Sequence, residues 1–352
     1  MKFATFYFIF FISIVTLASQ NESKLVIDAA NGQTNNNPLI RLRNYNGIDL
    51  MWIHSDHPSN TFVGSDTGTK NNINGGATSN TFVGSQVGNN NTTGKDNTGV
   101  GYGAMNHNIT GSYNTAIGSL ALLSTTGSQY NTAVGYAAGR LYDNGYNNVF
   151  IGANTDVNAA GLFNVIAIGQ GTVVTASSTA RFGNSATGSY GGWANWTNVS
   201  DGRFKKNVRE NVVGLDFIMK LKPVTYNLDV SGISETLKEN HGQEWDLLMK
   251  EAIVKKEKMV QSGFIAQDVE KAAKEVGYDF SGVDAPKNDQ DFYGLRYAEF
   301  VVPLVKAVQE LNREMHQQNE KMDQENKQLA DRIQNLEILL GLDNNSYSAN
   351  LE

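Results

Sequence analysis

The sequence contains no cysteine and few charged residues, and both scarcities exclude classes of protein. Without cysteine there is no disulfide framework and no thiolate site for zinc or an iron–sulfur cluster. Charged residues make up 18% of the 352 positions, below the roughly 25% of an ordinary globular domain. The net charge of −7 at pH 7 argues against a nucleic-acid-binding surface or a polybasic membrane patch, because either needs clustered Lys and Arg.

Long apolar runs are also absent, except at the start of the chain. After the basic Met1-Lys2 pair, an apolar stretch extends from Phe3 to Ala18. A basic start, an apolar stretch and small residues are typical of a secretory signal, and we expect cleavage between Ala18 and Gln20. The stretch of 16 residues is short for a membrane anchor, although an uncleaved anchor is the alternative. The sequence thus predicts a secreted or surface-displayed chain with no membrane span after signal cleavage.

Glycine, by contrast, is abundant, and much of it belongs to an internal repeat of the form Asn-Thr-apolar-Val-Gly. The last glycines of its seven copies are spaced 20 residues and then five times 17 residues apart: Gly64, Gly84, Gly101, Gly118, Gly135, Gly152 and Gly169. A fixed period of this size predicts a solenoid whose turns bury their apolar faces against one another. Seventeen residues are too few for a strand plus a crossover helix, so we expect an all-β coil. A second glycine upstream in most periods predicts two short strands and two turns per period.

The repeat has a surface poor in charge, with eight charged residues between Pro58 and Val199. Such a surface suits stacked polar ladders, and the small interior of each turn favours the association of several chains. The repeat resembles the β-roll heads of trimeric autotransporter adhesins, which carry a similar Asn-x-Ala-x-Gly core. That resemblance implies a surface adhesin that binds a cell-surface or glycan ligand.

The composition changes at Ser200, where charge becomes frequent and the repeat stops. We expect residues 200–297 to form a small α+β domain. Its expected elements are a helical segment at 212–221, a strand at 223–228, a strand at 263–267 and a helix at 268–276 with Asp268 as N-cap.

A long helix is predicted from Ala298 to about Leu340, with a heptad pattern. One core position holds Val301, Val308, Met315, Met322, Leu329 and Leu336, and the other holds Val305, Asn312, Asn319, Asn326, Ile333 and Leu340. The two series are offset by three and four residues, as the core positions of a coiled coil require. Buried Asn at such positions fixes register and oligomeric state at a cost in stability. The alternative is an amphipathic helix that packs on its own domain.

Candidate catalytic residues lie where the repeat ends. Ser200 and Lys205 are five residues apart. A serine hydroxyl is a weak nucleophile until a base removes its proton, and a lysine serves as that base only when burial lowers its pKa. Lys205 follows Phe204, an apolar neighbour beside which it could be buried. Spacing alone does not distinguish a dyad from an ordinary Ser-Asp-Gly turn.

Four segments in order resemble the C-terminal intramolecular chaperone of phage endosialidase tailspikes, which is similar to the self-cleaving domain of the myelin regulatory factor. They are Ser200-Asp-Gly-Arg-Phe-Lys-Lys-Asn-Val208, Leu221-Lys-Pro-Val-Thr-Tyr226, Gly263-Phe-Ile-Ala-Gln-Asp-Val-Glu270, and the stretch from Tyr297 to Leu311. The resemblance implies a domain that trimerises, guides assembly of the β-structured shaft and then cuts itself off with a Ser-Lys dyad.

Carried over to this chain, the resemblance makes Ser200 the nucleophile and Lys205, rather than Lys206, the base, with cleavage between Val199 and Ser200. Auxiliary candidates follow from the residues themselves. Asp201 could bond Lys205 or backbone amides, or simply form the turn, and Arg203 could balance Asp201 or form a surface ion pair. His241 is the one histidine inside the expected processing domain. The five histidines have no ligand spacing, so no metal and no cofactor are expected.

The sequence therefore predicts a mainly β solenoid of β-roll or β-helix type, a small α+β domain and a C-terminal trimeric coiled coil. The expected order is a signal peptide (1–19), an N-terminal β cap (20–57), β-roll repeats (58–183), a neck (184–199), the self-cleaving chaperone (200–297), the coiled-coil helix (298–341) and a flexible tail (342–352). The predicted function is a homotrimeric secreted or surface fibre with an autoproteolytic serine peptidase domain that acts on no external substrate.

Two alternatives remain open. One is a structural adhesin whose chaperone never cleaves. The other is a glycan-degrading tailspike, which needs a pair of carboxylates, and the repeats offer only Asp66, Asp96, Asp143 and Asp156.

Overall fold

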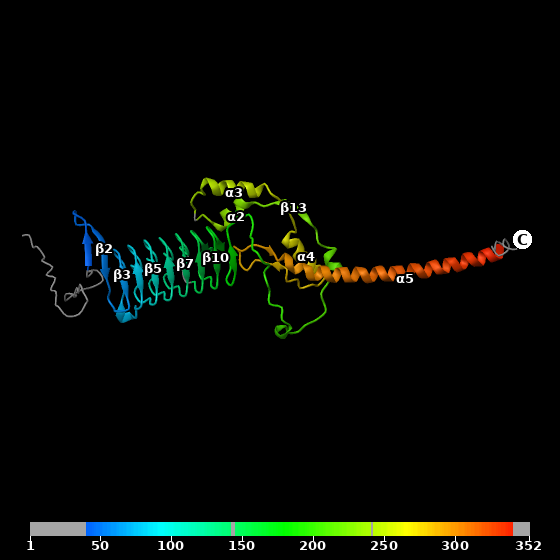
Figure 1. Cartoon of the computed structure of the whole chain (residues 1–352), viewed down its shortest axis with the longest axis horizontal. Helices are drawn as coiled ribbons and strands as arrows, with labels where there is room; N and C mark the ends of the chain where they lie inside the picture. Colours follow the sequence, from blue (N-terminus) through cyan, green and yellow to red (C-terminus); the bar gives the residue numbers. More distant parts are fainter. Residues whose placement is uncertain (1–39, 142–144, 241, 341–352) are drawn as a thin grey trace, which may run out of the picture. The chain divides into compact units, whose positions relative to one another are not determined.

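The computed structural model describes residues 40–141, 145–240 and 242–340. These residues fall into two compact units, divided in the chain between Tyr130 and Asn131. Figure 1 shows their helices and strands. The segments predicted as signal peptide and C-terminal tail lie outside the described residues. In the described part of the chain, no helix is long and apolar enough to cross a membrane.

The first unit begins with an antiparallel hairpin and continues as a parallel coil. Its elements are β1 (Ile40–Arg43), β2 (Asp49–His54), β3 (Thr61–Val63), the 3-10 turn η1 (Ile73–Gly75), β4 (Thr81–Val83), β5 (Thr98–Val100) and β6 (Thr115–Ile117). β2 pairs antiparallel with both β1 and β3, and β3 to β6 pair parallel in an unbroken register. The first period is three residues longer than the next, and it contains the three-residue turn η1.

Each strand of the coil buries its middle residue and exposes its neighbours to a greater degree, as the period of two dictates. Phe62 and Phe82 are fully buried and stack with ring centroids 5.4 Å apart. Gly99 takes the same place in β5, where an added Cβ would lie 2.6 Å from Val87 Cγ1. The interior is therefore filled by large side chains in some turns, and where a turn has glycine, the side chain of Val87 fills the space.

The glycine after each strand is required by backbone geometry. Gly84 has φ +129°, and an added Cβ would lie 2.6 Å from the carbonyl oxygen of Gly101 in the next turn. Only glycine tolerates both this conformation and this approach.

The second unit continues with the same kind of turn and then changes to a mixed α/β region. Its solenoid strands are β7 (Thr132–Val134), β8 (Val149–Ile151), β9 (Asp156–Val157), β10 (Ile166–Ile168), β11 (Val173–Val174) and β12 (Ala180–Phe182). β7, β8, β10 and β12 pair parallel in that order, and β9 pairs with β11. The β-solenoid expected from the repeat is thus confirmed.

The expectation of two strands in every period is wrong for most turns. Among the described residues, a second strand per turn occurs only as β9 and β11. The corresponding segments elsewhere are turns with left-handed residues such as Met105 and Leu122 (φ 53° and 47°). β11 instead contains two β-branched valines, which favour extended backbone.

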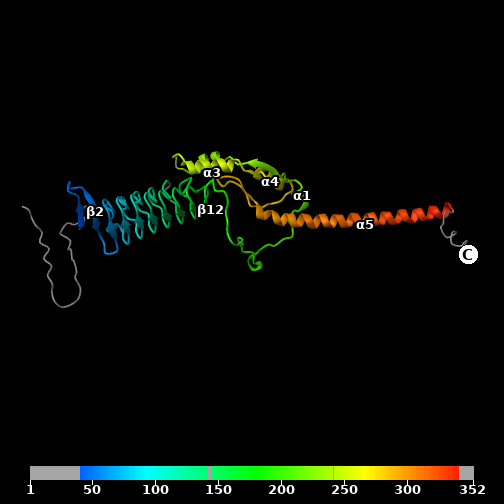
Figure 2. The same ribbon diagram turned by 45° about the horizontal axis from the view of Figure 1, so that its top comes forward.

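The mixed region follows the solenoid. Its elements are η2 (Gly202–Phe204), α1 (Leu215–Ile218), β13 (Val224–Asn227), α2 (Val230–Leu237), α3 (Leu247–Glu257), β14 (Val260–Gly263), α4 (Ala266–Glu275), β15 (Val283–Asp284), β16 (Gly294–Leu295), η3 (Tyr297–Phe300) and α5 (Val301–Leu340). The C-terminal helix is therefore confirmed as α5. Figure 2 shows α1 beside the first part of α5, where Glu310 Oε2 accepts a hydrogen bond from Leu215 N at 2.7 Å.

An aromatic core holds this region together. Phe217 of α1, Phe280 and Phe300 are buried, together with Val269 and Ala272 of α4. Phe280 lies 4.9 Å from Phe217 and 4.8 Å from Phe300, measured between ring centroids. These contacts join α1, α4 and η3, which leads directly into α5, in one cluster.

Two motifs singled out in the sequence meet beside this core. Gly263 ends β14, and an added Cβ there would lie 2.4 Å from the hydroxyl of Tyr297. That hydroxyl accepts a hydrogen bond from Phe264 N at 3.2 Å. The strand expected at 263–267 instead ends at Gly263, because the chain bends there to start α4.

Candidate functional site

Ser200 and Lys205 flank a single turn of 3-10 helix, η2. Asp201 caps the turn, and its side chain accepts a hydrogen bond from Arg203 N at 2.9 Å. The N–H of Lys205 in turn bonds the carbonyl of Gly202 at 3.1 Å. The capped turn therefore fixes the short backbone segment that separates residues 200 and 205.

The side chains of Ser200 and Lys205 are hydrogen-bonded to each other. Lys205 Nζ donates to Ser200 Oγ at 2.9 Å. This distance is within reach for proton transfer between a nucleophile and its base. To act as the base, the Lys205 amine must accept the hydroxyl proton of Ser200, which requires its neutral form, and removal of water from the pair favours that form.

Neither residue is buried in the single chain. Ser200 and Lys205 are exposed, and Phe204 between them is 75% exposed. The burial of Lys205 beside Phe204 that the sequence suggested is thus not found within one chain. The whole segment from 188 to 200 is exposed, including Val199 at the expected cleavage position.

Asp201 and Arg203 form an ion pair rather than contacting Lys205. Arg203 Nη2 lies 2.6 Å from Asp201 Oδ2, and its Nε lies 2.9 Å from the same oxygen. The pKa of Asp201 is below its ordinary value because the side chain and backbone N–H of Arg203 both donate to its carboxylate. Of the three roles weighed for Asp201, bonding a backbone amide and forming the turn are present in this geometry, whereas a bond to Lys205 is not among its contacts here.

The remaining candidates do not join this group. His241 lies outside the described residues. Over residues 40–141, 145–240 and 242–340, no three His, Asp or Glu side chains are grouped closely enough to hold a metal ion. Asp156, one of the carboxylates weighed for glycan cleavage, is buried and accepts hydrogen bonds from the backbone N–H groups of Leu141 and Val157 at 3.0 and 2.9 Å.

Sequence reasoning missed two charged residues that contact the chain shortly before the expected cleavage position. Glu239 is 1% exposed and accepts from Ser185, and Lys256 donates to the carbonyls of Ser185 and Thr187. Lys256 lies in the run Lys255-Lys256-Glu257-Lys258, which has the composition of a solvated helix end. No local signal in the sequence distinguishes it from its neighbours.

The comparison with protein families decides the nature of this region. Residues 200–278 match the family model described as chaperone of endosialidase. These residues are similar to that family and lie within the chaperone domain expected at 200–297. The match begins at Ser200 and includes Lys205, β13, β14 and α4. No curated protein and no solved structure matches the chain.

The family match supports an intramolecular chaperone of the tailspike or fibre type. The same family suggests a self-cleaving peptidase domain. The solenoid that precedes it is the β-structured part of the same chain.

Proposed function

We propose that the chain is a secreted or surface homotrimeric fibre whose chaperone domain drives assembly and then cuts the chain between Val199 and Ser200. The observation that carries this proposal is the hydrogen bond between Lys205 Nζ and Ser200 Oγ within a domain of the chaperone-of-endosialidase family.

The reaction uses groups that lie next to one another in the chain. Ser200 Oγ attacks the carbonyl carbon of Val199 while neutral Lys205 removes the hydroxyl proton. The proton returns to the amide nitrogen of Ser200 as the peptide bond breaks, which leaves an ester between Val199 and the serine oxygen. Water then hydrolyses the ester, with release of the Val199 carboxyl group and restoration of the hydroxyl.

Trimerisation supplies the burial that the single chain lacks. The heptad core of α5 is unpartnered along its length, with Met315, Met322 and Leu329 each at least 52% exposed. A helix of 40 residues with this apolar heptad core gains stability by packing against copies of itself. Bringing three copies of residues 200–205 together in this way would desolvate the lysines and favour their neutral form.

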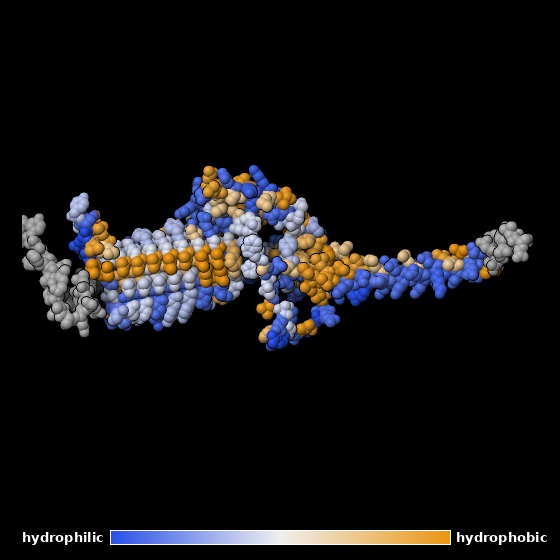
Figure 3. Space-filling view, in the orientation of Figure 1, coloured by the Kyte–Doolittle hydropathy of each residue, from blue (hydrophilic) through white to orange (hydrophobic). Residues whose placement is uncertain are grey.

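The outer face of the solenoid also supports association. The residue before each glycine is an outward Val or Ile, in register within each unit: Val63, Val83, Val100 and Ile117, then Val134, Ile151 and Ile168. Figure 3 shows apolar side chains as an orange band on this part of the molecule. An apolar face of this extent fits other copies of the same repeat.

Cleavage is tested with matched lysine variants in the full chain. We expect the wild-type chain to give two fragments whose intact masses place the break between Val199 and Ser200. Ser200→Ala and Lys205→Met should remain uncut, whereas Lys206→Met, which removes the neighbouring exposed amine, should be cut normally. A single uncut band for the wild type would favour the non-cleaving adhesin, and normal cleavage of Lys205→Met would refute the dyad.

A further inference from the structure

A buried carboxylate of the chaperone domain contacts the end of the solenoid. Glu239, just after α2, is 1% exposed. Its Oε1 accepts a hydrogen bond from Ser185 N at 2.8 Å, and its Oε2 accepts one from Ser185 Oγ at 2.5 Å. Burying a carboxylate costs free energy unless its oxygens are hydrogen-bonded. The two hydrogen bonds from Ser185 therefore offset part of the cost of burying Glu239.

A lysine from α3 contacts the same segment from its carbonyl side. Lys256 Nζ donates to the backbone oxygens of Ser185 and Thr187, both at 2.7 Å. Burial lowers the pKa of Lys256, and the charge of Glu239 opposes that shift. Together the two side chains satisfy N–H and C=O groups of residues 185–187, which follow the last solenoid strand, β12.

A second set of contacts lies on the preceding turn. Thr175 Oγ1 donates to Asp291 Oδ1 at 2.6 Å, and Asn288 Nδ2 donates to the carbonyl of Thr175 at 2.8 Å. Gly171, with φ +63°, is so close that an added Cβ would lie 2.8 Å from the backbone oxygen of Glu239. The contacts therefore depend on the folded backbone of the turn that contains β11 and β12.

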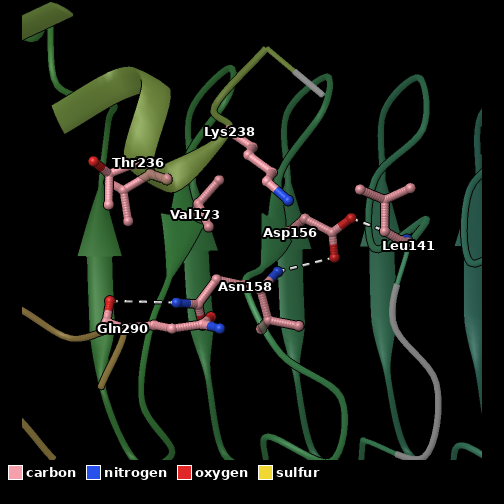
Figure 4. A pocket seen from close by; sticks show the side chains of 9 residues that line it. Leu141, Asp156, Asn158, Val173, Thr236, Lys238 and Gln290 are labelled. Carbon is pink, nitrogen blue, oxygen red and sulfur yellow. Dashed lines mark hydrogen bonds between the residues drawn. The ribbon is translucent and has the colours of Figure 1, made fainter. Parts of the chain in front are cut away.

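A cavity of about 250 Å³ is lined by Lys238 and Gln290, the chain neighbours of Glu239 and Asp291, and by solenoid residues that include Asp156 and Val173. Figure 4 shows Lys238, at the end of α2, with its side chain extending toward Asp156, while Asn158 and Gln290 lie on the other side of the cavity. Asn158 Nδ2 donates to the carbonyl of Gln290 at 3.4 Å.

We propose that these contacts, which we call the seam, are the surface by which the chaperone domain recognises and caps the folded end of the solenoid. The seam joins residues 171–187 to Glu239, Lys256 and the 288–291 loop. In the described chain no strand follows β12 in its sheet, and an open edge of this kind needs a cap. The inference rests on the chaperone role in the proposed function, but it does not require cleavage or trimerisation.

The seam has a further consequence for processing. Its two sides lie on opposite sides of the Val199–Ser200 peptide in the sequence. The seam therefore holds the two products together after the peptide bond is broken, and the cap stays in place until the seam itself opens.

The test uses the full chain with Ser200→Ala, which is expected to stay uncut. Glu239→Ala and Lys256→Met are compared with Glu244→Ala and Lys250→Met, which alter an exposed ion pair before and within α3. We expect amide hydrogen exchange in residues 171–187 to be at least about tenfold faster in the seam variants, because fewer contacts oppose local opening. Exchange in β4 and β5 should be unchanged, and both control variants should match the parent chain.

If Glu239→Ala does not accumulate as folded protein, Asn288→Ala gives the same test, because Asn288 is exposed and its amide bonds the Thr175 carbonyl. Unchanged exchange in residues 171–187 of Lys256→Met and Asn288→Ala would overturn the seam. The cleavage assay on the Ser200 chain is scored separately, so failure of the dyad leaves this result standing.

Discussion

The side chain of Asp156 is a carboxyl group held inside the solenoid next to the seam. Burial raises its pKa to about 7, although the N–H groups of Val157 and Leu141 and the charge of Arg140 favour the ionised form. Lys238 lines the same cavity. At neutral pH this carboxyl group is therefore close to its titration point rather than fully ionised.

A raised pKa in the folded state makes the stability of the second unit depend on pH. The unfolded carboxyl group ionises near pH 3.8, whereas the folded one retains its proton up to about pH 7. The contribution of the Asp156 carboxyl group to the free energy of unfolding is therefore fully present below pH 3.8 and is lost as the pH rises to about 7. The loss is up to about 4 kcal/mol, at 1.36 kcal/mol per pKa unit.

Thermal unfolding of the Ser200→Ala chain between pH 4 and 8 measures this loss. Asp156→Asn should remove most of the pH dependence over that window, whereas Asp216→Asn, at an exposed position of α1, should keep it. Identical pH profiles for the Ser200→Ala parent and its Asp156→Asn variant would contradict the assignment.

The residues near the expected cleavage position could be named from sequence because they are neighbours in the chain. Ser200 and Lys205 are joined by one short turn, and the Ser-Asp-Gly signal of that turn is local. Glu239 and Lys256 could not be named, because their partners at 185–187 are 54 or more residues away. The exposure of Lys205 could not be predicted from its neighbours either. Phe204 is apolar and suggested burial, but it faces solvent in the single chain.

At the scale of elements, the solenoid is held by a ladder of buried asparagine amides. Asn97 is fully buried; its Nδ2 donates to the carbonyl of Gly111 at 2.8 Å, and its Oδ1 accepts from Asn114 N at 3.0 Å. Asn80 makes the equivalent bonds one turn earlier, to Gly94 O and from Asn97 N. Each side chain thus satisfies one backbone group in its own turn and one in the next.

Removing the Asn97 side chain takes away the acceptor of the buried Asn114 N–H, whereas the Gly111 carbonyl keeps its hydrogen bond from Asn108 Nδ2. Asn97→Ala should destabilise the first unit by about 2 kcal/mol, since one unsatisfied buried group costs about 1–3 kcal/mol. Asn74→Ala, at an exposed position of η1, should change stability by less than about 0.5 kcal/mol. Chemical denaturation followed by circular dichroism compares the two, and equal stability of both variants would show that the ladder is dispensable.

Elements with a strong period were predictable, whereas those set by packing were not. The 17-residue spacing predicts the parallel coil, and the heptad predicts α5. α2 and α3 were not predicted, because their place depends on contacts such as that of Ser231 with Glu257, 26 residues away. Asp268 was expected to cap a helix but lies inside α4, which begins at Ala266 without a side-chain cap.

At the scale of the whole molecule, assembly is expected to depend on the heptad core of α5. Met315→Lys with Met322→Lys places charge at core positions, where burial of an unpaired ammonium is costly. The double variant should elute as a monomer in size-exclusion chromatography with light scattering, and it should remain uncut. Gln317→Lys with Gln324→Lys adds the same charge on the opposite side of the helix and should remain trimeric and be cut.

Two outcomes would contradict this account. A trimer formed by the core double variant would show that α5 does not determine assembly. Efficient cleavage of a monomeric variant would show that the dyad needs no second copy, and burial of Lys205 would then have to arise within one chain.

The asparagine ladder also bears on how such chains can vary in length. The side chains of Asn60, Asn80, Asn97, Asn131 and Asn148 each bond a carbonyl of their own turn and the N–H of the next turn, so the ladder does not distinguish one of these copies from another. Insertion or loss of a whole 17-residue unit leaves all amides matched, whereas a partial unit breaks the register. The reach of the molecule can therefore change in steps through duplication or deletion in its gene, with no redesign of either end.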